Sequence, residues 1–183
     1  MQTDGSISSG SMRIKSEIYE YVESIIFSLA IVVLIFTFIF RIVGVVNISM
    51  QNTLFDGNRL ILYNINYSPK QGDIIVFSAL ELNEPLIKRV IAVGGQKVDI
   101  NYTTHTVYVD DKAQVEPYIK ELTSTQGDVK LPVIVPQGYV FVMGDNRNYS
   151  LDSRFSQVGM IDQRYIIGKA IFRIFPLNVF GRI

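Results

Sequence analysis

The residues of this chain that could carry chemistry are a serine and a lysine, Ser49 and Lys88. A serine hydroxyl becomes a nucleophile for acyl transfer when a neutral lysine amine lies within hydrogen-bond reach and accepts its proton. Ser49 stands in VVNISMQNTL, directly after an apolar segment, and Lys88 stands in PLIKRVIAV among β-branched and leucine neighbours. Burial in such a strand lowers a lysine pKa from about 10.4 toward neutrality. Taken alone, the two residues favour ordinary roles, a loop or capping hydroxyl and a charged strand edge.

Other kinds of active site have little support in the sequence. No cysteine is present, which excludes disulfides, zinc-thiolate sites and a cysteine nucleophile. The only histidine, His105, lies in the polar segment NYTTHT and is best explained as a solvated hairpin residue. Nucleotide-binding glycine motifs are absent, and 17 basic residues balance 17 acidic ones, which argues against nucleic-acid binding. We therefore expect no metal, no cofactor and no nucleic-acid partner.

The elements that must position these residues begin with an apolar block. Residues 24–40 read SIIFSLAIVVLIFTFIF without a charge, and the apolar character continues after Arg41 to Val46. Because about 20 apolar residues cross the hydrocarbon layer as a helix, we predict a transmembrane helix over residues 24–46, preceded by a tail over residues 1–23. The block is too long for a cleaved secretory signal, and the remaining chain is too short to bury it. The flanking lysines and arginines do not decide the orientation.

After residue 46 the pattern changes to short β-branched and aromatic runs between Gly, Pro, Asn and Asp, which is typical of strands and turns. The predicted strands cover residues 59–63, 73–78, 86–93, 97–101, 106–109, 139–143 and 166–174. Residues 121–130 predict a loop. The fold class that follows is mainly β: a single N-terminal transmembrane helix and then a compact β-rich domain over residues 47–183.

Four blocks occur in the order and spacing of the bacterial type I signal peptidases. SMQNTL at residues 49–54 resembles the family's SMxPTL, GDIIVF at 72–77 its GDIVVF strand, and KRVIAVGG at 88–95 its KRVIGxPGD segment. The longest block is VPQG, then FVMGDNR, then Ser150, Asp152, Ser153 and Arg154, and it is similar to GDNRxxSxDSR. Lysine at position 88, where the endoplasmic-reticulum relatives carry histidine, resembles the bacterial type. With the apolar block, the resemblance covers nearly the whole chain.

The resemblance implies that Ser49 attacks the scissile carbonyl while neutral Lys88 acts as general base, through an acyl-enzyme. It implies that the Ser150 hydroxyl orients the lysine amine, and that the Ser49 backbone N–H and the Asn47 side chain form the oxyanion hole. Further residues would support the site by ion pairs and hydrogen bonds: Arg89, Asp145, Asp152 and Arg154.

The substrates implied by the resemblance are secreted pre-proteins whose signal peptides end in a small-x-small motif. The implied partners are these pre-proteins and the lipid bilayer. The β-rich peptidase domain would then face outward from the cell membrane, with the N-terminal tail in the cytoplasm. The inserted β domain of some relatives would be reduced to a hairpin region near residues 97–130.

Two departures from the family pattern keep other functions open. Asn52 replaces a proline and loses the fixed φ that stiffens the loop, and AVGGQ at residues 92–96 lacks the usual proline and acidic residue. One alternative is a non-catalytic or single-substrate signal-peptidase-like protein that assists assembly of exported subunits such as pilins. Another is a relative of the self-cleaving repressors, against which the apolar block and the absence of a DNA-binding module argue.

Overall fold

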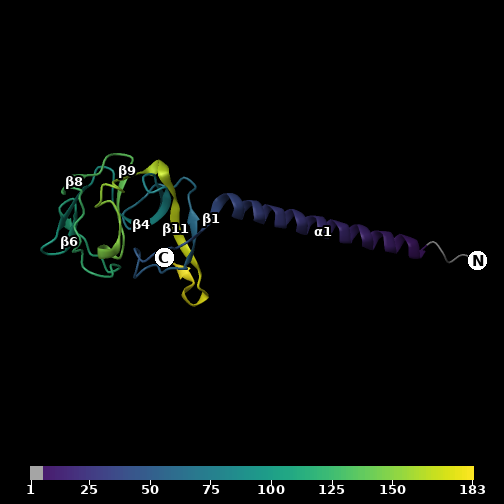
Figure 1. Ribbon diagram of the computed structural model, residues 1–183. Helices are drawn as coiled ribbons and strands as arrows, with labels where there is room; N and C mark the ends of the chain where they lie inside the picture. The colour runs from purple at the N-terminus through teal and green to yellow at the C-terminus, as the bar shows by residue number, and fades with distance from the viewer. Residues whose placement is uncertain (1–5) are drawn as a thin grey trace, which may run out of the picture. The chain divides into compact units, whose positions relative to one another are not determined.

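The computed structural model describes residues 6–183, with the side chains of residues 17–34 and 41–183 (Figure 1). The chain divides into two compact units, Met1–Phe40 and Arg41–Ile183. Of the predicted tail, residues 1–5 lie outside the described residues, and residues 6–23 belong to a helix.

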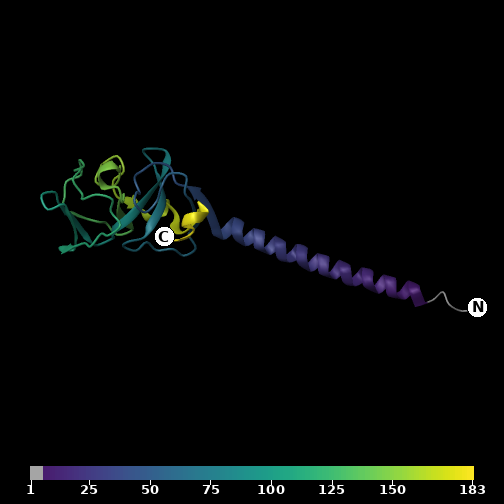
Figure 2. The same cartoon turned by 90° about the horizontal axis from the view of Figure 1, so that it is seen from below.

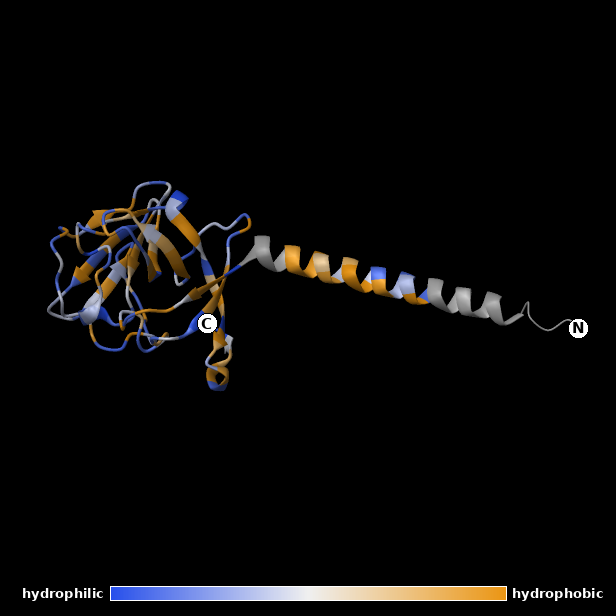
Figure 3. Cartoon of the chain, turned by 45° about the vertical axis from the view of Figure 1, so that its right-hand side comes forward, coloured by the Kyte–Doolittle hydropathy of each residue, from blue (hydrophilic) through white to orange (hydrophobic). Residues whose placement is uncertain are grey.

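The first unit is the helix α1, Ser6–Ile39, which contains no proline. Its described apolar side chains are exposed, among them Ile25, Phe27 and Leu29, and they form the orange stretch of the helix in Figure 3. The hydroxyl of Ser28 donates to the Ser24 carbonyl oxygen at 2.7 Å, so this polar group is satisfied within the helix. Among the residues described, we find no helix with both the length and the apolar character needed to cross a membrane.

The predicted helix over residues 24–46 is wrong at its C-terminal end. α1 ends at Ile39, and Phe40–Gly44 forms the strand β1, which lies beside β2 at the edge of a sheet. Val45 follows, with only 3% of its surface exposed, and its N–H donates to the Asn58 carbonyl oxygen at 2.8 Å. Periodicity cannot distinguish helix from strand in a continuous apolar run, so the sequence did not show this boundary.

The second unit is built on a large sheet. Its strands, in spatial order, are β1, β2 (Arg59–Tyr63), β11 (Ile166–Phe175), β3 (Ile74–Ala79), β4 (Glu84–Val93), β9 (Tyr139–Met143) and β10 (Ile161–Asp162). The pairs from β2 to β10 are antiparallel, and the short strand β12 (Gly181–Arg182) pairs with β11 (Figures 1 and 2). β11 therefore separates β2 from β3, although it comes near the end of the chain.

A smaller sheet forms the region that we predicted as the reduced insertion. Its order is β7 (Lys112–Ala113), β6 (Thr106–Val109), β5 (Lys97–Asn101) and β8 (Val133–Ile134). Residues 114–132, between β7 and β8, contain no strand. Three 3-10 helices complete the unit: η1 (Arg147–Tyr149), η2 (Gln163–Tyr165) and η3 (Leu177–Val179).

Both faces of β3 and β9 are buried, which explains why these two strands are continuously apolar. On β3, Ile74 and Val76 belong to one hydrophobic cluster, whereas Ile75 and Phe77 belong to a second. The residues of β9 alternate between this second cluster and a third, which includes β5 and β6. The predicted compact, mainly β domain is confirmed, and its packing fixes β4, which carries Lys88, and the end of β9.

Candidate active site

Ser49 lies in the loop that joins β1 to β2. Two backbone hydrogen bonds close the base of this loop, from Val45 N to Asn58 O at 2.8 Å and from Gly57 N to Val45 O at 3.0 Å. The neighbouring Met50 is only 1% exposed and packs in the hydrophobic cluster that includes β2 and β3. The closed base and the buried methionine together fix the backbone at the serine.

Lys88 lies on β4 and reaches the serine. Its Nζ is 2.9 Å from Ser49 Oγ and 3.1 Å from the Ile87 carbonyl oxygen, and the residue is 3% exposed. Burial lowers the pKa of Lys88 from 10.5 to about 8, against the opposing effect of the negative charges of Asp152 and Glu84. Near pH 8 a large fraction of the amine is therefore neutral and able to accept the serine proton.

The turn after β9 binds the backbone carbonyl groups of Ile48 and Ser49. Asn146 N donates to the Ser49 carbonyl oxygen at 3.0 Å, and Asn146 Nδ2 donates to the Ile48 carbonyl oxygen at 3.1 Å. The close approach requires glycine at position 144, because a Cβ there would lie 2.5 Å from the Ser49 carbonyl oxygen. Sequence analysis missed the role of Asn146, although it stands inside the GDNR motif.

Arg89 and Asp145, both predicted to support the site, form a two-pronged ion pair. Arg89 Nε lies 2.8 Å from Asp145 Oδ1, and Nη2 lies 2.6 Å from Oδ2. Thr53, from the Ser49 loop, donates its hydroxyl to the same carboxylate. The Tyr118 ring covers the guanidinium, with its centroid 3.9 Å from Cζ. This charge-assisted network ties β4, the turn after β9 and the Ser49 loop together.

Asp152 and Arg154, the other predicted supporting residues, form a second ion pair in which both side chains are fully buried. Arg154 Nε donates to Asp152 Oδ1 at 2.8 Å, and Gly144 N donates to Asp152 Oδ2 at 3.0 Å. Arg154 Nη2 also donates to the Arg147 carbonyl oxygen at 2.6 Å. These hydrogen bonds offset the free-energy cost of removing the two charges from water. They also hold the turn that contacts Ser49.

A third ion pair, between Arg147 and Glu116, was missed by the sequence analysis. Arg147 Nη2 lies 2.6 Å from Glu116 Oε1, and Nη1 donates to the Thr123 hydroxyl at 3.0 Å. The pair fastens residues 114–132 onto the turn after β9. No local pattern could reveal it, because the two partners stand 31 positions apart and in different segments.

Ser150 does not make the hydrogen bond to Lys88 that the resemblance implied, and the oxyanion role of Asn47 stays a prediction. The Ser150 hydroxyl is buried without a hydrogen-bond partner in the described chain, and it packs so closely on Gly144 that a Cβ there would lie 2.3 Å from Oγ. The Asn47 side chain likewise forms no hydrogen bond with the described residues. Its backbone φ is 80°, and its N–H donates to Asp56 Oδ1 at 3.2 Å.

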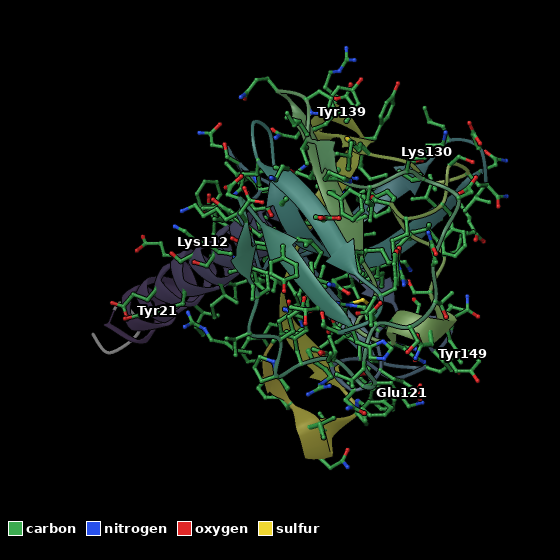
Figure 4. All side chains as sticks on the ribbon, turned by 90° about the vertical axis from the view of Figure 1, so that its left-hand side faces the viewer. Tyr21, Lys112, Glu121, Lys130, Tyr139 and Tyr149 are labelled. Carbon is green, nitrogen blue, oxygen red and sulfur yellow. The ribbon has the colours of Figure 1, made fainter. Side chains whose placement is uncertain are left out.

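A cleft of about 550 Å³ opens at the Ser49–Lys88 pair. Its walls are mainly apolar and include Ile48, Leu86 and Leu151, with Tyr149 also in its lining and largely exposed (Figure 4). β4 pairs with β3 over residues 84–89 but with β9 only from residue 89 onward. The edge of β4 over residues 84–88 is therefore open along the cleft, and an extended peptide can add to such an edge.

Comparisons with known proteins identify the family of this chain. A family model described as "Signal peptidase, peptidase S26" matches residues 18–175. Signal peptidase I of Bacillus licheniformis is 37% identical over 174 residues, which cover 90% of this chain and 92% of that protein. Signal peptidase IB of Staphylococcus aureus (strain COL) is 37% identical over 184 residues, which cover 91% and 94% respectively.

A solved structure of a signal peptidase I from Enterococcus faecalis V583 aligns with a TM-score of 0.48 at 28% identity, over 56% of this chain and 97% of that one. The family model and the two relatives extend over nearly the whole chain, which confirms the resemblance drawn from the four sequence blocks. This chain therefore belongs to the S26 family of signal peptidases and is a serine endopeptidase.

Proposed function

We propose that this chain removes signal peptides from exported pre-proteins, through an acyl-enzyme on Ser49 with Lys88 as general base. The observation that carries the proposal is the separation of 2.9 Å between Lys88 Nζ and Ser49 Oγ, at a buried position where the lysine pKa falls to about 8. Membership of the signal peptidase family supports this class of substrate.

The proposed reaction needs only these two side chains for its proton transfers. Ser49 Oγ attacks the scissile carbonyl carbon while its proton passes to the neutral amine of Lys88. The oxyanion accepts from the Ser49 backbone N–H, which donates to no other group in the described chain, with Asn47 as the proposed second donor. Lys88 then protonates the leaving amine of the mature protein. Water, deprotonated by Lys88, releases the signal peptide and restores Ser49.

The cleft and the open strand edge support the spacing of a small-x-small motif. In an extended peptide, residues two apart point to the same side, so the two small side chains would enter the apolar cleft beside Ile48 and Leu86. The open edge of β4 over residues 84–88 would bind the peptide backbone. The side chain at the intervening position would point away from the cleft, so the enzyme would not select the residue at that position.

The test is cleavage of a pre-protein ending in Ala-x-Ala by detergent-solubilised protein, with the product N-terminus read by mass spectrometry. We expect wild type to cut after the motif and Ser49→Ala and Lys88→Ala to be inactive. Lys112→Ala serves as the control, because Lys112 is an exposed lysine of β7 (Figure 4). No cleavage by wild type would reject the proposal in favour of a non-catalytic role in subunit assembly.

We also infer that α1 anchors the enzyme in the cell membrane, with the β unit on the outer side. Residues 24–40 contain no charge, and the described apolar side chains of this helix, such as Phe27 and Leu29, are exposed. An anchor would hold the enzyme beside its membrane-bound substrate and raise their effective concentration.

Alkaline carbonate extraction of cell membranes tests the anchor. We expect the full chain to remain in the membrane pellet, and a variant with Phe27→Lys and Leu29→Lys to be released, because each charge opposes insertion. External protease should degrade the β unit in intact spheroplasts. Release of the wild-type chain by carbonate would reject the anchor without bearing on the dyad.

A further inference from the structure

Glu84 places an exposed negative charge in the lining of the cleft. Among the described residues that line it, only Glu84 and Lys88 are charged, and Lys88 is buried whereas Glu84 is exposed at the start of β4. Glu84 forms no salt bridge and no side-chain hydrogen bond with the residues that the structure describes. Its charge therefore has no visible role in holding the fold.

Glu84 lies on the same face of β4 as Lys88, beside the strand edge along which a substrate peptide would bind. Glu84, Leu86 and Lys88 occupy alternate positions of one strand, so their side chains share a face, and all three line the cleft. Four residues of strand correspond to about 13 Å. The backbone of Glu84 therefore lies that far along β4 from the backbone of Lys88, at the other end of the open strand edge. Its negative charge also raises the pKa of Lys88, which shows that the cleft does not fully screen it.

We propose that Glu84 selects substrates that carry lysine or arginine about four residues from the scissile bond, on the side of that bond that runs along residues 84–88. An unpaired carboxylate beside an extended chain attracts a cation and repels an acidic side chain. The inference rests on the proposed function, because it requires a peptide to be bound along this edge. It adds a charge preference to a cleft whose other lining side chains are uncharged, apart from Lys88.

The test uses a set of peptides with a small-x-small motif. Each peptide carries lysine, glutamine or glutamate at a single position, which is varied from three to five residues on either side of the scissile bond. Rates are compared at pH 9, above the Lys88 pKa of about 8, so that changes at Glu84 do not act through Lys88 ionisation. At one of these positions we expect kcat/KM for the lysine peptide to exceed that for the glutamate peptide about two- to fivefold, as for an exposed ion pair. The preference should fall in 1 M salt.

Variants at Glu84 assign the preference to this side chain. Glu84→Gln should abolish it, Glu84→Lys should reverse it toward the glutamate peptide, and Glu81→Lys, on the exposed turn before β4 and outside the cleft, should leave it unchanged. The same ranking is expected in the Kd values measured with the Ser49→Ala variant, in which no turnover occurs.

Each failure has a separate meaning. Efficient cleavage with no charge preference, or a preference that survives in Glu84→Gln, overturns the inference and leaves the proposed function standing. If wild type cleaves none of the peptides, the proposed function fails. Equal Kd values for lysine and glutamate peptides with Ser49→Ala would then overturn the inference too, whereas a Glu84-dependent difference would uphold it as a property of binding.

Discussion

The fold makes Lys88 a base by making its protonated form unfavourable. The amine is removed from water, and its nearest partners are a hydroxyl and a carbonyl oxygen, with no carboxylate in hydrogen-bond contact. Activity should therefore depend on pH through this one group. We expect kcat/KM for an uncharged peptide to rise with pH around a midpoint near 8, the pKa of Lys88. Lys88→Arg should be inactive, because arginine stays protonated. A flat profile from pH 6 to 9 would contradict this assignment.

The same burial should cost stability. The folded-state pKa of Lys88 is about 8 and its ordinary value is 10.5, so between these values the unfolded chain binds the extra proton and stability rises with pH. Below pH 8 the full penalty is present. Lys88→Met should thus stabilise the protein at pH 7, by up to about 3 kcal/mol, and the gain should shrink by pH 10.5. Urea unfolding at the two pH values measures this, with Lys112→Met as a control that should show neither effect.

Substitution of Asn47 tests whether the oxyanion hole has a side-chain donor. Asn47 lines the cleft next to Ser49, and its side-chain amide forms no hydrogen bond with the described residues. If the amide donates only to the oxyanion, Asn47→Ala should lower kcat by up to about 10²-fold while KM changes little. Steady-state kinetics on a small-x-small peptide decide the matter: an unchanged kcat would leave the Ser49 N–H as the donor.

Among the elements, β9 and the turn after it position the serine most directly. A methyl group at Gly144 would lie 2.3 Å from Ser150 Oγ and 2.5 Å from the Ser49 carbonyl oxygen. Gly144→Ala should therefore push the Ser49 loop away, reduce stability by about 1–3 kcal/mol and lower kcat. Gly44→Ala is the matched control, because a Cβ at Gly44 meets nothing within 4 Å. Equal thermal unfolding curves for the two variants would show that the close approach is not rigid.

The strands with regular spacing could be predicted from sequence, whereas elements set by tertiary contacts could not. The predicted bounds of β2, β5, β6 and β9 agree with the structure. β1 was missed because its residues continue an apolar run, and pairing with β2 decides its form.

Within the site, the sequence blocks identify the residues that the structure brings together, such as Ser49 and Lys88. They do not reveal Asn146, which acts through its backbone N–H and its amide. They also do not reveal Glu116, which lies outside the blocks and meets Arg147 only in three dimensions. Local patterns specify residue types, but long-range pairs depend on the folded topology.

At the scale of the whole molecule, the hydrophobic core found among the described side chains lies in the second unit. All three clusters draw their members from residues 43–183. A chain of residues 41–183 should therefore fold alone and cleave short peptides at the rate of the full chain. It should process membrane-bound pre-proteins more slowly, because the effective concentration provided by α1 is lost. Thermal unfolding and the two activities, measured side by side, test this. Loss of folding in the shorter chain would contradict the division into units.

The position of β11 also determines when the enzyme can begin to act. This strand, Ile166–Phe175, fills the space between β2 and β3, and Arg173 on it donates from Nη1 to the Thr53 carbonyl oxygen in the Ser49 loop at 3.1 Å. The ribosome makes β11 well after Ser49 and Lys88. A nascent chain that carries Ser49 and Lys88 but not yet β11 thus lacks an inner strand of their sheet, and the peptidase cannot be completed before β11 has been made.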